Sequence, residues 1–331
     1  MTRQVDVLVV GAGPAGLAAA ARLAVGGAGS VEVLDREQRA GGVPRHCAHG
    51  GYGTWLHPLT GPAYARLLAD AAMRTGAVVR TGVSVLDWAG PPHGGPLALA
   101  TVGRDGPETV EARAVILATG ARERPRAARL VPGTRPAGVY TTGELQQAVH
   151  LYGQRIGTRA VIVGAEGVSY SAADTVRAAG ADVVAMVTES DRARTTRLRA
   201  QDARLRRRVP LLTGTAVVEL LGHGRLSGVR VRHRDGRTAV LACDTVVFTG
   251  DFVPENELAR RGGLTLAPET SRPGVFAAGG LLHPGESAAE AARAGARVAG
   301  TVQGFLNDPC RPAPEANRAA PSRISANTPM P

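Results

Sequence analysis

Three glycines near the N-terminus have the spacing of a phosphate-binding turn. Gly11, Gly13 and Gly16 form a G-x-G-x-x-G pattern directly after the apolar run 5–10 and directly before an Ala-rich helical segment. Gly11 makes the tight turn, Gly13 lets the backbone approach a pyrophosphate, and Gly16 lets the helix pack closely on the sheet. The phosphates then lie on the free N–H groups and the positive dipole end of the helix. Asp35 ends the next strand, where a carboxylate accepts hydrogen bonds from an adenosine ribose, so the pattern predicts a dinucleotide site.

A second, altered copy of this pattern follows in the middle of the chain. Gly164 and Gly167 come after a strand-like run, but Glu166 occupies the position of the second glycine and Ser169 that of the third. Glu166 brings a carboxylate toward the place where a pyrophosphate would approach. Glu189 lies close to the expected ribose-binding acid, while the arginines that follow it favour a 2′-phosphate. Two interpretations stay open: a working NAD(P)H site, or a vestigial or altered nucleotide site.

The segment His46-Cys47-Ala-His49 holds the other candidates for chemistry. The two imidazoles titrate near neutral pH and are suited to pass a proton, and a lone thiol can act through a sulfenic acid. A metal site is disfavoured, because three ligands within four residues have no fourth partner in view. We therefore predict that His46, Cys47 and His49 orient or serve a catalytic centre, with a purely structural role as the alternative.

These residues are positioned by two βαβ units. Short runs rich in Val and Leu predict buried strands, at 5–10, 31–34, 78–85, 97–102 and 114–118. A helix over 15–23 lies between the first two runs. The second unit consists of a strand over 160–163, a helix over 169–179 and a strand over 182–187. Later runs, separated by Gly turns, predict further strands at 209–212, 216–221, 226–233, 239–243 and 245–248, and then 275–280 before a helix over 287–305.

The sequence thus predicts an α/β protein with two Rossmann-like dinucleotide-binding domains of the three-layer ββα type, the second inserted in the first. We expect the first domain to comprise residues 1–150 and 244–307, and the second to comprise residues 151–243. Residues 308–331 lack periodicity and are rich in Pro, Ala, Asn and Ser, which predicts a disordered tail.

Composition excludes several classes of protein. The net charge of +11 comes from arginine, because the chain contains no lysine, and this excludes both a Walker P-loop and a Schiff-base catalyst. The arginine-rich segment 192–208 favours a solvated face or a docking face for an acidic partner over nucleic acid, because no aromatic residues interleave with it. No run reaches the length of a membrane span, and no signal peptide precedes the first strand. We expect a cytoplasmic protein with reduced thiols.

Further motifs carry a family resemblance. Two strands end in small residues, at Val115–Gly120 and Gly274–Gly279, and separate motifs lie at residues 41–53, 118–125, 132–143 and 249–258. Over about residues 4 to 305 the chain resembles the FAD-dependent pyridine nucleotide-disulfide oxidoreductase superfamily, which is glutathione-reductase-like. Within it, the motifs look like the FAD subunits of opine oxidase, hydrogen cyanide synthase and amino-acid dehydrogenases.

The resemblance implies FAD as the cofactor, with NAD(P)H as a second ligand. The residues expected to contact FAD are Gly11, Gly13, Pro14, Ala15, Gly16, Asp35, Arg36, Gly42, Val43, Pro44, Val83, Ala118, Thr119, Gly120, Gly279, Gly280 and Leu281. The family often has Asp at the position of Gly280, bonded to the ribityl chain. His283 and Glu286 stand nearby and could compensate for its absence, or could belong to a plain loop before the helix.

The resemblance also implies an electron-handling subunit of an amino-acid, imino-acid or opine dehydrogenase. Its expected partners are a second oxidoreductase subunit of the D-amino-acid-oxidase type and a small iron–sulfur protein, since only Cys310 lies in the tail where many relatives carry a cysteine cluster. The segment after Gly42 holds one cysteine, so reduction of a dithiol is disfavoured. Two alternatives are a free-standing NAD(P)H-dependent flavin reductase or oxidase, and a non-catalytic nucleotide-binding subunit.

Overall fold

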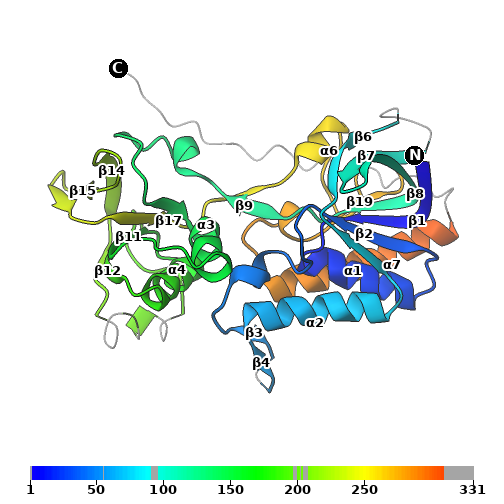
Figure 1. Cartoon of the computed structure of the whole chain (residues 1–331), viewed down its shortest axis with the longest axis horizontal. Coiled ribbons are helices and arrows are strands. Elements are labelled where there is room, and N and C mark those ends of the chain that lie inside the picture. The colour runs from blue at the N-terminus through cyan, green and yellow to red at the C-terminus, as the bar shows by residue number, and fades with distance from the viewer. Residues whose placement is uncertain are drawn as a thin grey trace.

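The computed structural model describes residues 2–54, 56–90, 96–196, 200–201, 203 and 208–308. It shows two lobes joined by a narrow connection, with the N-terminus in one lobe and the middle of the chain in the other (Figure 1). Each lobe has a mostly parallel sheet between a layer of helices and a layer of antiparallel strands. The predicted fold class, two Rossmann-like domains of an α/β protein, is confirmed.

The first lobe is built on a seven-stranded sheet. Its order is β5 (Val78–Thr81), β2 (Val31–Asp35), β1 (Thr2–Val10), β8 (Gly106–Leu117), β7 (Leu97–Gly103) and β6 (Ser84–Trp88), and β19 (Val275–Ala277) also pairs with β8. Strands β5, β2, β1, β8 and β19 run parallel, while β7 and β6 are antiparallel. The run predicted as one strand over 78–85 is divided at Gly82, whose φ of +70° turns the chain between β5 and β6.

Alternation along β1 explains the three layers. Val7 and Val9 are fully buried against the helices α1 (Pro14–Val25), α2 (Gly61–Arg74) and α7 (Ala288–Asn307). Leu8 and Val10 point to the opposite face, where they join a core with residues of β7, β8 and α6 (Glu257–Arg261). Because side chains of a strand alternate between its two faces, a strand that is apolar at every position must be covered on both sides.

The helices begin at recognisable signals. Pro14 is the first residue of α1, where its missing N–H is not needed. Ser287 caps α7 together with Glu290 in a capping box, and Thr141 and Glu144 form the same device at the start of α3 (Thr142–Gln146). Helix α3 continues into the π-type segment η3 (Gln147–Leu151). Helices α2 and α3 were not predicted from the sequence, although the Thr-x-x-Glu pattern of the second was visible.

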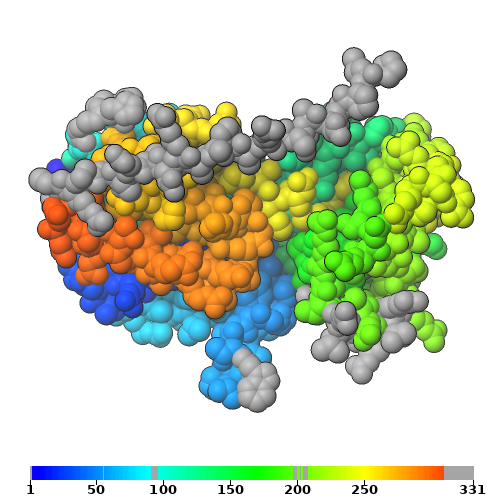
Figure 2. Space-filling view, turned by 180° about the vertical axis from the view of Figure 1, so that it is seen from behind, coloured from blue at the N-terminus to red at the C-terminus, as the bar shows by residue number. Residues whose placement is uncertain are grey.

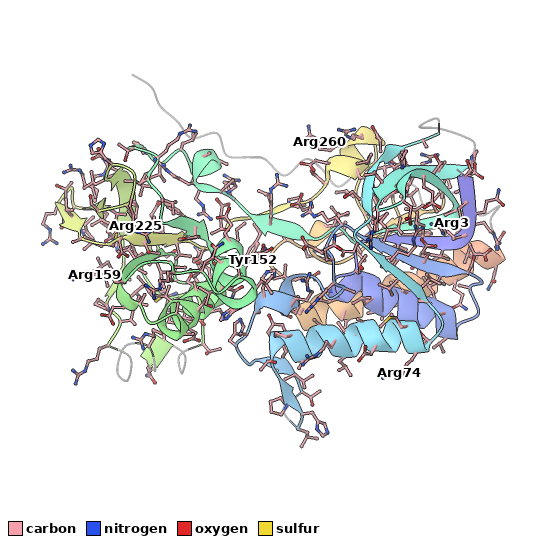
Figure 3. The ribbon with its side chains drawn as sticks, viewed as in Figure 1. Arg3, Arg74, Tyr152, Arg159, Arg225 and Arg260 are labelled. Carbon is pink, nitrogen blue, oxygen red and sulfur yellow. The ribbon has the colours of Figure 1, made fainter. Side chains whose placement is uncertain are left out.

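The second lobe repeats the plan. Its parallel sheet has the order β10 (Val139–Thr141), β17 (Thr245–Phe248), β11 (Arg159–Val163), β12 (Asp182–Val187) and β13 (Leu211–Leu212). Helices α3 and α4 (Gly167–Ala178) cover one face. The other face packs against a three-stranded sheet of β14 (Thr215–Leu221), β15 (Gly228–His233) and β16 (Thr238–Leu241). Figure 3 marks Arg159 and Arg225 in this lobe and Arg3 in the first.

The chain crosses between the lobes on a two-stranded ribbon of β9 (Ala121–Glu123) and β18 (Phe252–Pro254). The borders predicted from the sequence put β10 and β17 in the first domain, but both lie in the second sheet, where Val246 pairs with Val139 and with Val161. Composition could not show this, because buried parallel strands of the two sheets are equally rich in Val. We propose domain borders at this ribbon, near residues 123 and 252.

Smaller features complete the first lobe. The 3₁₀ turn η1 (Val43–His46) precedes a short hairpin of β3 (Tyr52–Gly53) and β4 (Pro58–Leu59), which projects from the body (Figures 1 and 2). Two further 3₁₀ turns are η2 (Arg126–Arg129) and η5 (Gly279–Leu281). No described helix is long and apolar enough to cross a membrane. The predicted disordered tail lies, after Asp308, outside the described residues.

Candidate functional site

Four loops converge on the first turn of α1. A methyl group added at Gly11 would lie 2.4 Å from the carbonyl oxygen of Ala118, and one added at Gly279 would lie 2.6 Å from the Cβ of Ala15. A methyl group at Gly42 would lie 2.8 Å from the Cα of Gly13. The fold therefore brings the loops after β1, β2, β8 and β19 to one edge of the sheet. Parallel strands place their carboxyl ends at the same edge, which is where ligands bind in open α/β sheets.

Gly13 and Gly16 have different physical roles at this turn. Gly13 is the N-cap of α1, with φ −81°, and a methyl group there would meet nothing within 4 Å. A methyl group at Gly16 would lie 1.9 Å from the carbonyl oxygen of Gly11. The fold thus requires glycine at 16, whereas at 13 it leaves open space before the free N–H groups of a helix. That space, with the helix dipole behind it, suits an anionic pyrophosphate.

Asp35 lies at the end of β2, beside the same turn. Its Oδ2 accepts a hydrogen bond of 2.6 Å from the N–H of Ala12, and its Oδ1 accepts one of 2.8 Å from the N–H of Glu37. Each carboxylate oxygen has a further acceptor site, so the side chain can also take a ribose hydroxyl. Arg36 next to it is exposed, and the buried Val83 donates its N–H to the carbonyl oxygen of Asp35.

The remaining candidate cofactor residues lie around the same opening. Thr119 donates its hydroxyl to the carbonyl oxygen of Glu255 at 2.7 Å, and the carbonyl oxygen of Gly120 accepts the N–H of Glu255 at 2.9 Å. These bonds fix the end of β8 to the interlobe connection. Gly279, Gly280 and Leu281 form η5, and Val43 and Pro44 begin η1. We propose that these residues contact the flavin half of FAD.

A buried, unpaired acceptor lies at this opening. The Oε1 atom of Glu286 is buried and has no hydrogen-bond partner among the described residues, and it lies 3.6 Å from the ideal Cβ position of Gly279. Burial raises the pKa of Glu286. Because buried acceptors are almost always paired, this orphan oxygen fits a ligand that brings hydroxyl donors to η5, as a ribityl chain does. His283, the other group considered at Gly280, is exposed.

Replacement of Glu286 by Ala should weaken FAD binding about tenfold or more, because a hydrogen bond to a charged group contributes roughly 1.5–3 kcal/mol. The dissociation constant can be measured by titrating FAD into the apoprotein and following flavin fluorescence. Glu286→Gln keeps an acceptor and should recover part of the affinity. The exposed Glu189 of the second lobe provides the matched control, and equal affinity in Glu286→Ala and Glu189→Ala would contradict this role.

The candidate catalytic residues lie in and after η1, against α3 and η3 of the second lobe. The buried thiol of Cys47 donates to Oε1 of Gln146 at 3.2 Å and to the carbonyl oxygen of Val43 at 3.4 Å. Burial raises the pKa of Cys47, although a hydrogen bond with Tyr52 opposes this. Since the thiolate is the reactive form, the structure favours a structural thiol over a nucleophile. Gln146 and Tyr52 were not identified from the sequence.

The two candidate histidines differ in environment. His46 is 8% exposed, and its burial, aided by the charges of Arg45 and His150, lowers its pKa to about 4. His49 is half-buried, forms a 2.6 Å hydrogen bond between its Nδ1 and the carbonyl oxygen of Gly50, and contacts the ring of Tyr52. No group of three metal-binding side chains occurs among the described residues. We propose that these histidines pass a proton to or from the flavin.

The low pKa of His46 predicts acid sensitivity. Below its ordinary value of 6.5 the unfolded chain binds a proton at His46 that the folded protein does not bind until about pH 4. The free energy of unfolding should therefore fall as pH decreases from 6.5 to 4, by up to roughly 3 kcal/mol. Urea unfolding of wild type and His46→Gln across this range measures it. An equal loss in both proteins would show that other groups cause the acid sensitivity.

Glu123 connects the ribbon to the second lobe. Its buried carboxylate accepts the N–H of Gly143 at the start of α3, at 3.0 Å, and the N–H of Gly250 before β18, at 2.9 Å. This residue was not identified from the sequence, because its partners are distant along the chain. Its contacts hold α3, and with it Gln146, at a fixed position on the ribbon.

The second fingerprint lies in the other lobe, between β11 and α4. Gly164 makes the turn with φ +139°, and Glu166 is the N-cap of α4. The carboxylate of Glu166 folds back to accept the N–H of Ala165 at 3.0 Å and the hydroxyl of Ser169 at 3.1 Å. Gly167 is open to added bulk, and Glu189 is exposed just after β12. The predicted residues therefore lie at the same end of this sheet. The carboxylate of Glu166 forms its hydrogen bonds inside the turn.

The fold and the first turn define a protein with two dinucleotide-binding domains. The chain belongs to the pyridine nucleotide-disulphide oxidoreductase family, whose model matches residues 5–296. The predicted superfamily is confirmed, and FAD is the cofactor that this membership implies, with NAD(P)H as a second ligand of the family. The open turn at Gly13, Asp35 and the unpaired oxygen of Glu286 fit FAD.

Individual relatives agree with this assignment. The chain is 28% identical to the A-subunit of opine oxidase from Rhizobium meliloti over 90% of this chain and 61% of that protein. It is 30% identical to the alpha-subunit of sarcosine oxidase from Rhizobium meliloti over 93% of this chain and 31% of that protein. The thioredoxin reductase structure from T. acidophilum superposes with a TM-score of 0.77 and 25% identity, over 93% of this chain and all of that one. The chain thus spans less than two thirds of the two oxidase subunits.

Proposed function

We propose that this oxidoreductase is the FAD-binding, electron-handling subunit of a dehydrogenase or oxidase for amino acids, imino acids or opines. Its proposed partners are a second oxidoreductase subunit of the D-amino-acid-oxidase type and a small iron–sulfur protein. The relatives named as subunits of opine oxidase and sarcosine oxidase support this assignment. The free thiols of Cys47 and Cys243 are consistent with the proposed cytoplasmic location.

The observation that carries the proposal is the state of Cys47. Its thiol is buried and donates a hydrogen bond to Gln146. The other described cysteine, Cys243, is buried in the core of the second lobe. Reduction of a disulfide substrate needs an accessible thiol pair that exchanges through a mixed disulfide. The described cysteines do not form such a pair, which favours the oxidase-subunit relatives over the thioredoxin reductases as a guide to function.

Bound FAD would accept a hydride and release electrons one or two at a time. In the proposed role, the loops around Gly13 and η5 hold and orient it, the buried His46 stays neutral near physiological pH, and Glu123 and Gln146 fix the second lobe against the η1 segment. Electrons then enter or leave through a partner docked on the chain.

Anaerobic visible spectra test the proposal. The purified protein should show an oxidised flavin spectrum that NADH and NADPH leave unchanged. It should bleach when the second subunit, copurified with the tagged chain from native cells, is added with its amino-acid or opine substrate. Rapid bleaching by NADH or NADPH alone would instead establish the free-standing flavin reductase or oxidase, which the full-length match to thioredoxin reductase favours. A protein that does not bind FAD would indicate the non-catalytic nucleotide-binding subunit.

A further inference from the structure

The two fingerprint turns can be compared position by position within this chain. Gly11, Gly13 and Gly16 of the first turn correspond to Gly164, Glu166 and Ser169 of the second, and in both turns the middle residue is the N-cap of the helix that follows. In the first turn nothing lies within 4 Å of a methyl group added at the middle position. In the second turn that position carries a carboxylate.

The carboxylate of Glu166 lies within the second turn itself. Its Oε2 accepts the N–H of Ala165 and the hydroxyl of Ser169, and it lies 2.8 Å from the ideal Cβ position of Gly164. A free N–H at the start of a helix is what a dinucleotide phosphate binds. The Glu166 carboxylate already accepts hydrogen bonds within this turn. A pyrophosphate would have to displace this carboxylate or bind beside its negative charge, which repels it.

A second layer of hydrogen bonds holds Glu166 in place. The Ser169 hydroxyl accepts the N–H of Glu166 at 3.1 Å and lies 2.6 Å from the hydroxyl of Thr249, which donates to the carbonyl oxygen of Val163 at 3.0 Å. The residue in place of the third glycine therefore anchors the residue in place of the second. Swinging the carboxylate out of the turn would break this network.

The loop after β12 closes over the same turn. The N–H of Arg194 donates to the carbonyl oxygen of Ala165 at 2.8 Å, and the two segments form a β-bridge between Glu166 and Arg194. The arginines after Glu189, considered from the sequence as binders of a 2′-phosphate, thus belong to a segment that contacts the turn directly through its backbone.

We propose that Glu166 is a specificity-determining residue that takes the phosphate position of the second domain, so that this domain does not bind NAD(P)H. The inference rests on the proposed function in one respect. If the second domain does not bind NAD(P)H, these nucleotides cannot donate electrons to the flavin, and the partner subunit is the remaining electron donor. In this protein the second domain keeps the dinucleotide-binding fold, but a side-chain carboxylate lies in the turn where a pyrophosphate would approach.

Calorimetric titration of NADH and of NADPH into the FAD-loaded protein tests the inference without any partner. Wild type should show no binding at millimolar nucleotide. Glu166→Gly should bind at least one of the two nucleotides at least tenfold more tightly than the wild-type limit, and Glu166→Gln should lie between them. Glycine is accepted at helix N-caps, and thermal unfolding will verify that the variants fold. Asp182→Ala, which removes an exposed carboxylate at the other end of β12 in the same lobe, should bind no better than wild type.

Two outcomes would overturn the inference: micromolar binding of NADH or NADPH by wild type, or a folded Glu166→Gly protein that binds no better than wild type. Neither decides the proposed function, since a protein can bind NADH and still leave its flavin oxidised. The proposed function is contradicted instead by bleaching of the wild-type flavin with NADH or NADPH, or by a wild-type protein that does not bind FAD, so the two failures are distinguishable.

Discussion

Gly13→Glu should yield a folded, colourless protein. The Cβ position at Gly13 is free of contacts within 4 Å, so the fold accepts a side chain there. The new carboxylate, however, would lie at the N-terminus of α1, where the pyrophosphate of FAD is proposed to bind, and would oppose it by bulk and by charge. We expect FAD affinity to fall at least 100-fold, which corresponds to roughly 3 kcal/mol. The absorbance ratio of flavin to protein after purification, and titration of FAD into the apoprotein, measure this loss.

Gly300→Glu is the matched control for this variant. Gly300 is exposed on α7, and its Cβ position is also free of contacts within 4 Å, so the same residue and charge are introduced away from the turn. This protein should keep its flavin. Retention of the yellow colour by Gly13→Glu would show that FAD does not bind at the first fingerprint.

Gly295→Ala should destabilise the protein. Gly295 lies on the buried side of α7, and a methyl group there would lie 1.9 Å from the carbonyl oxygen of Ala15 in α1. The backbones of α1 and α7 must therefore separate, and overpacking of this kind typically costs about 1–3 kcal/mol. A backbone atom cannot move aside as a flexible side chain can, so we expect a loss at the upper end, about 3 kcal/mol. Urea unfolding of the FAD-loaded protein measures the change.

Gly300→Ala separates packing from helix propensity in the same helix. Alanine is favoured over glycine in a helix interior by roughly 0.5–1 kcal/mol, and at Gly300 no contact opposes it. The two substitutions are chemically identical, yet they should change stability in opposite directions. If Gly295→Ala also stabilised the protein, the close approach of α1 and α7 would be wrong. Because α1 begins at the first fingerprint, Gly295→Ala should also weaken FAD binding.

Much of the first site could be predicted because its determinants are local. The spacing of Gly11, Gly13 and Gly16 after a β-branched run encodes a strand, a turn and a helix within a few residues, and Asp35 follows at the end of the next strand. The same reasoning found the second fingerprint and its altered residue Glu166. The position of the Glu166 carboxylate was not predictable, because the same residue at the same place in the sequence can point into the turn or away from it.

The boundaries of the domains depended on long-range pairing. Residues 245–248 form a short Val-rich run that would suit either sheet, and they join the second because Val246 pairs with Val139 and Val161. Nothing within the run determines its neighbours, since the hydrogen-bonding groups of a parallel strand are the same for every sequence. The ribbon of β9 and β18 could not be predicted for the same reason, because its two short strands are far apart in the sequence.

The class of fold, the position of the first dinucleotide turn and the lone cysteine after η1 follow from the amino-acid sequence alone, because each depends on neighbouring residues. The folded chain was needed to show that Cys47 forms a hydrogen bond with Gln146, that Glu123 connects the ribbon to the second lobe, and that Gly295 is required for the contact of α7 with α1. Most of these interactions join residues about 100 or more positions apart, and their energies depend on burial and on atomic separation. Such quantities exist only once the chain has folded.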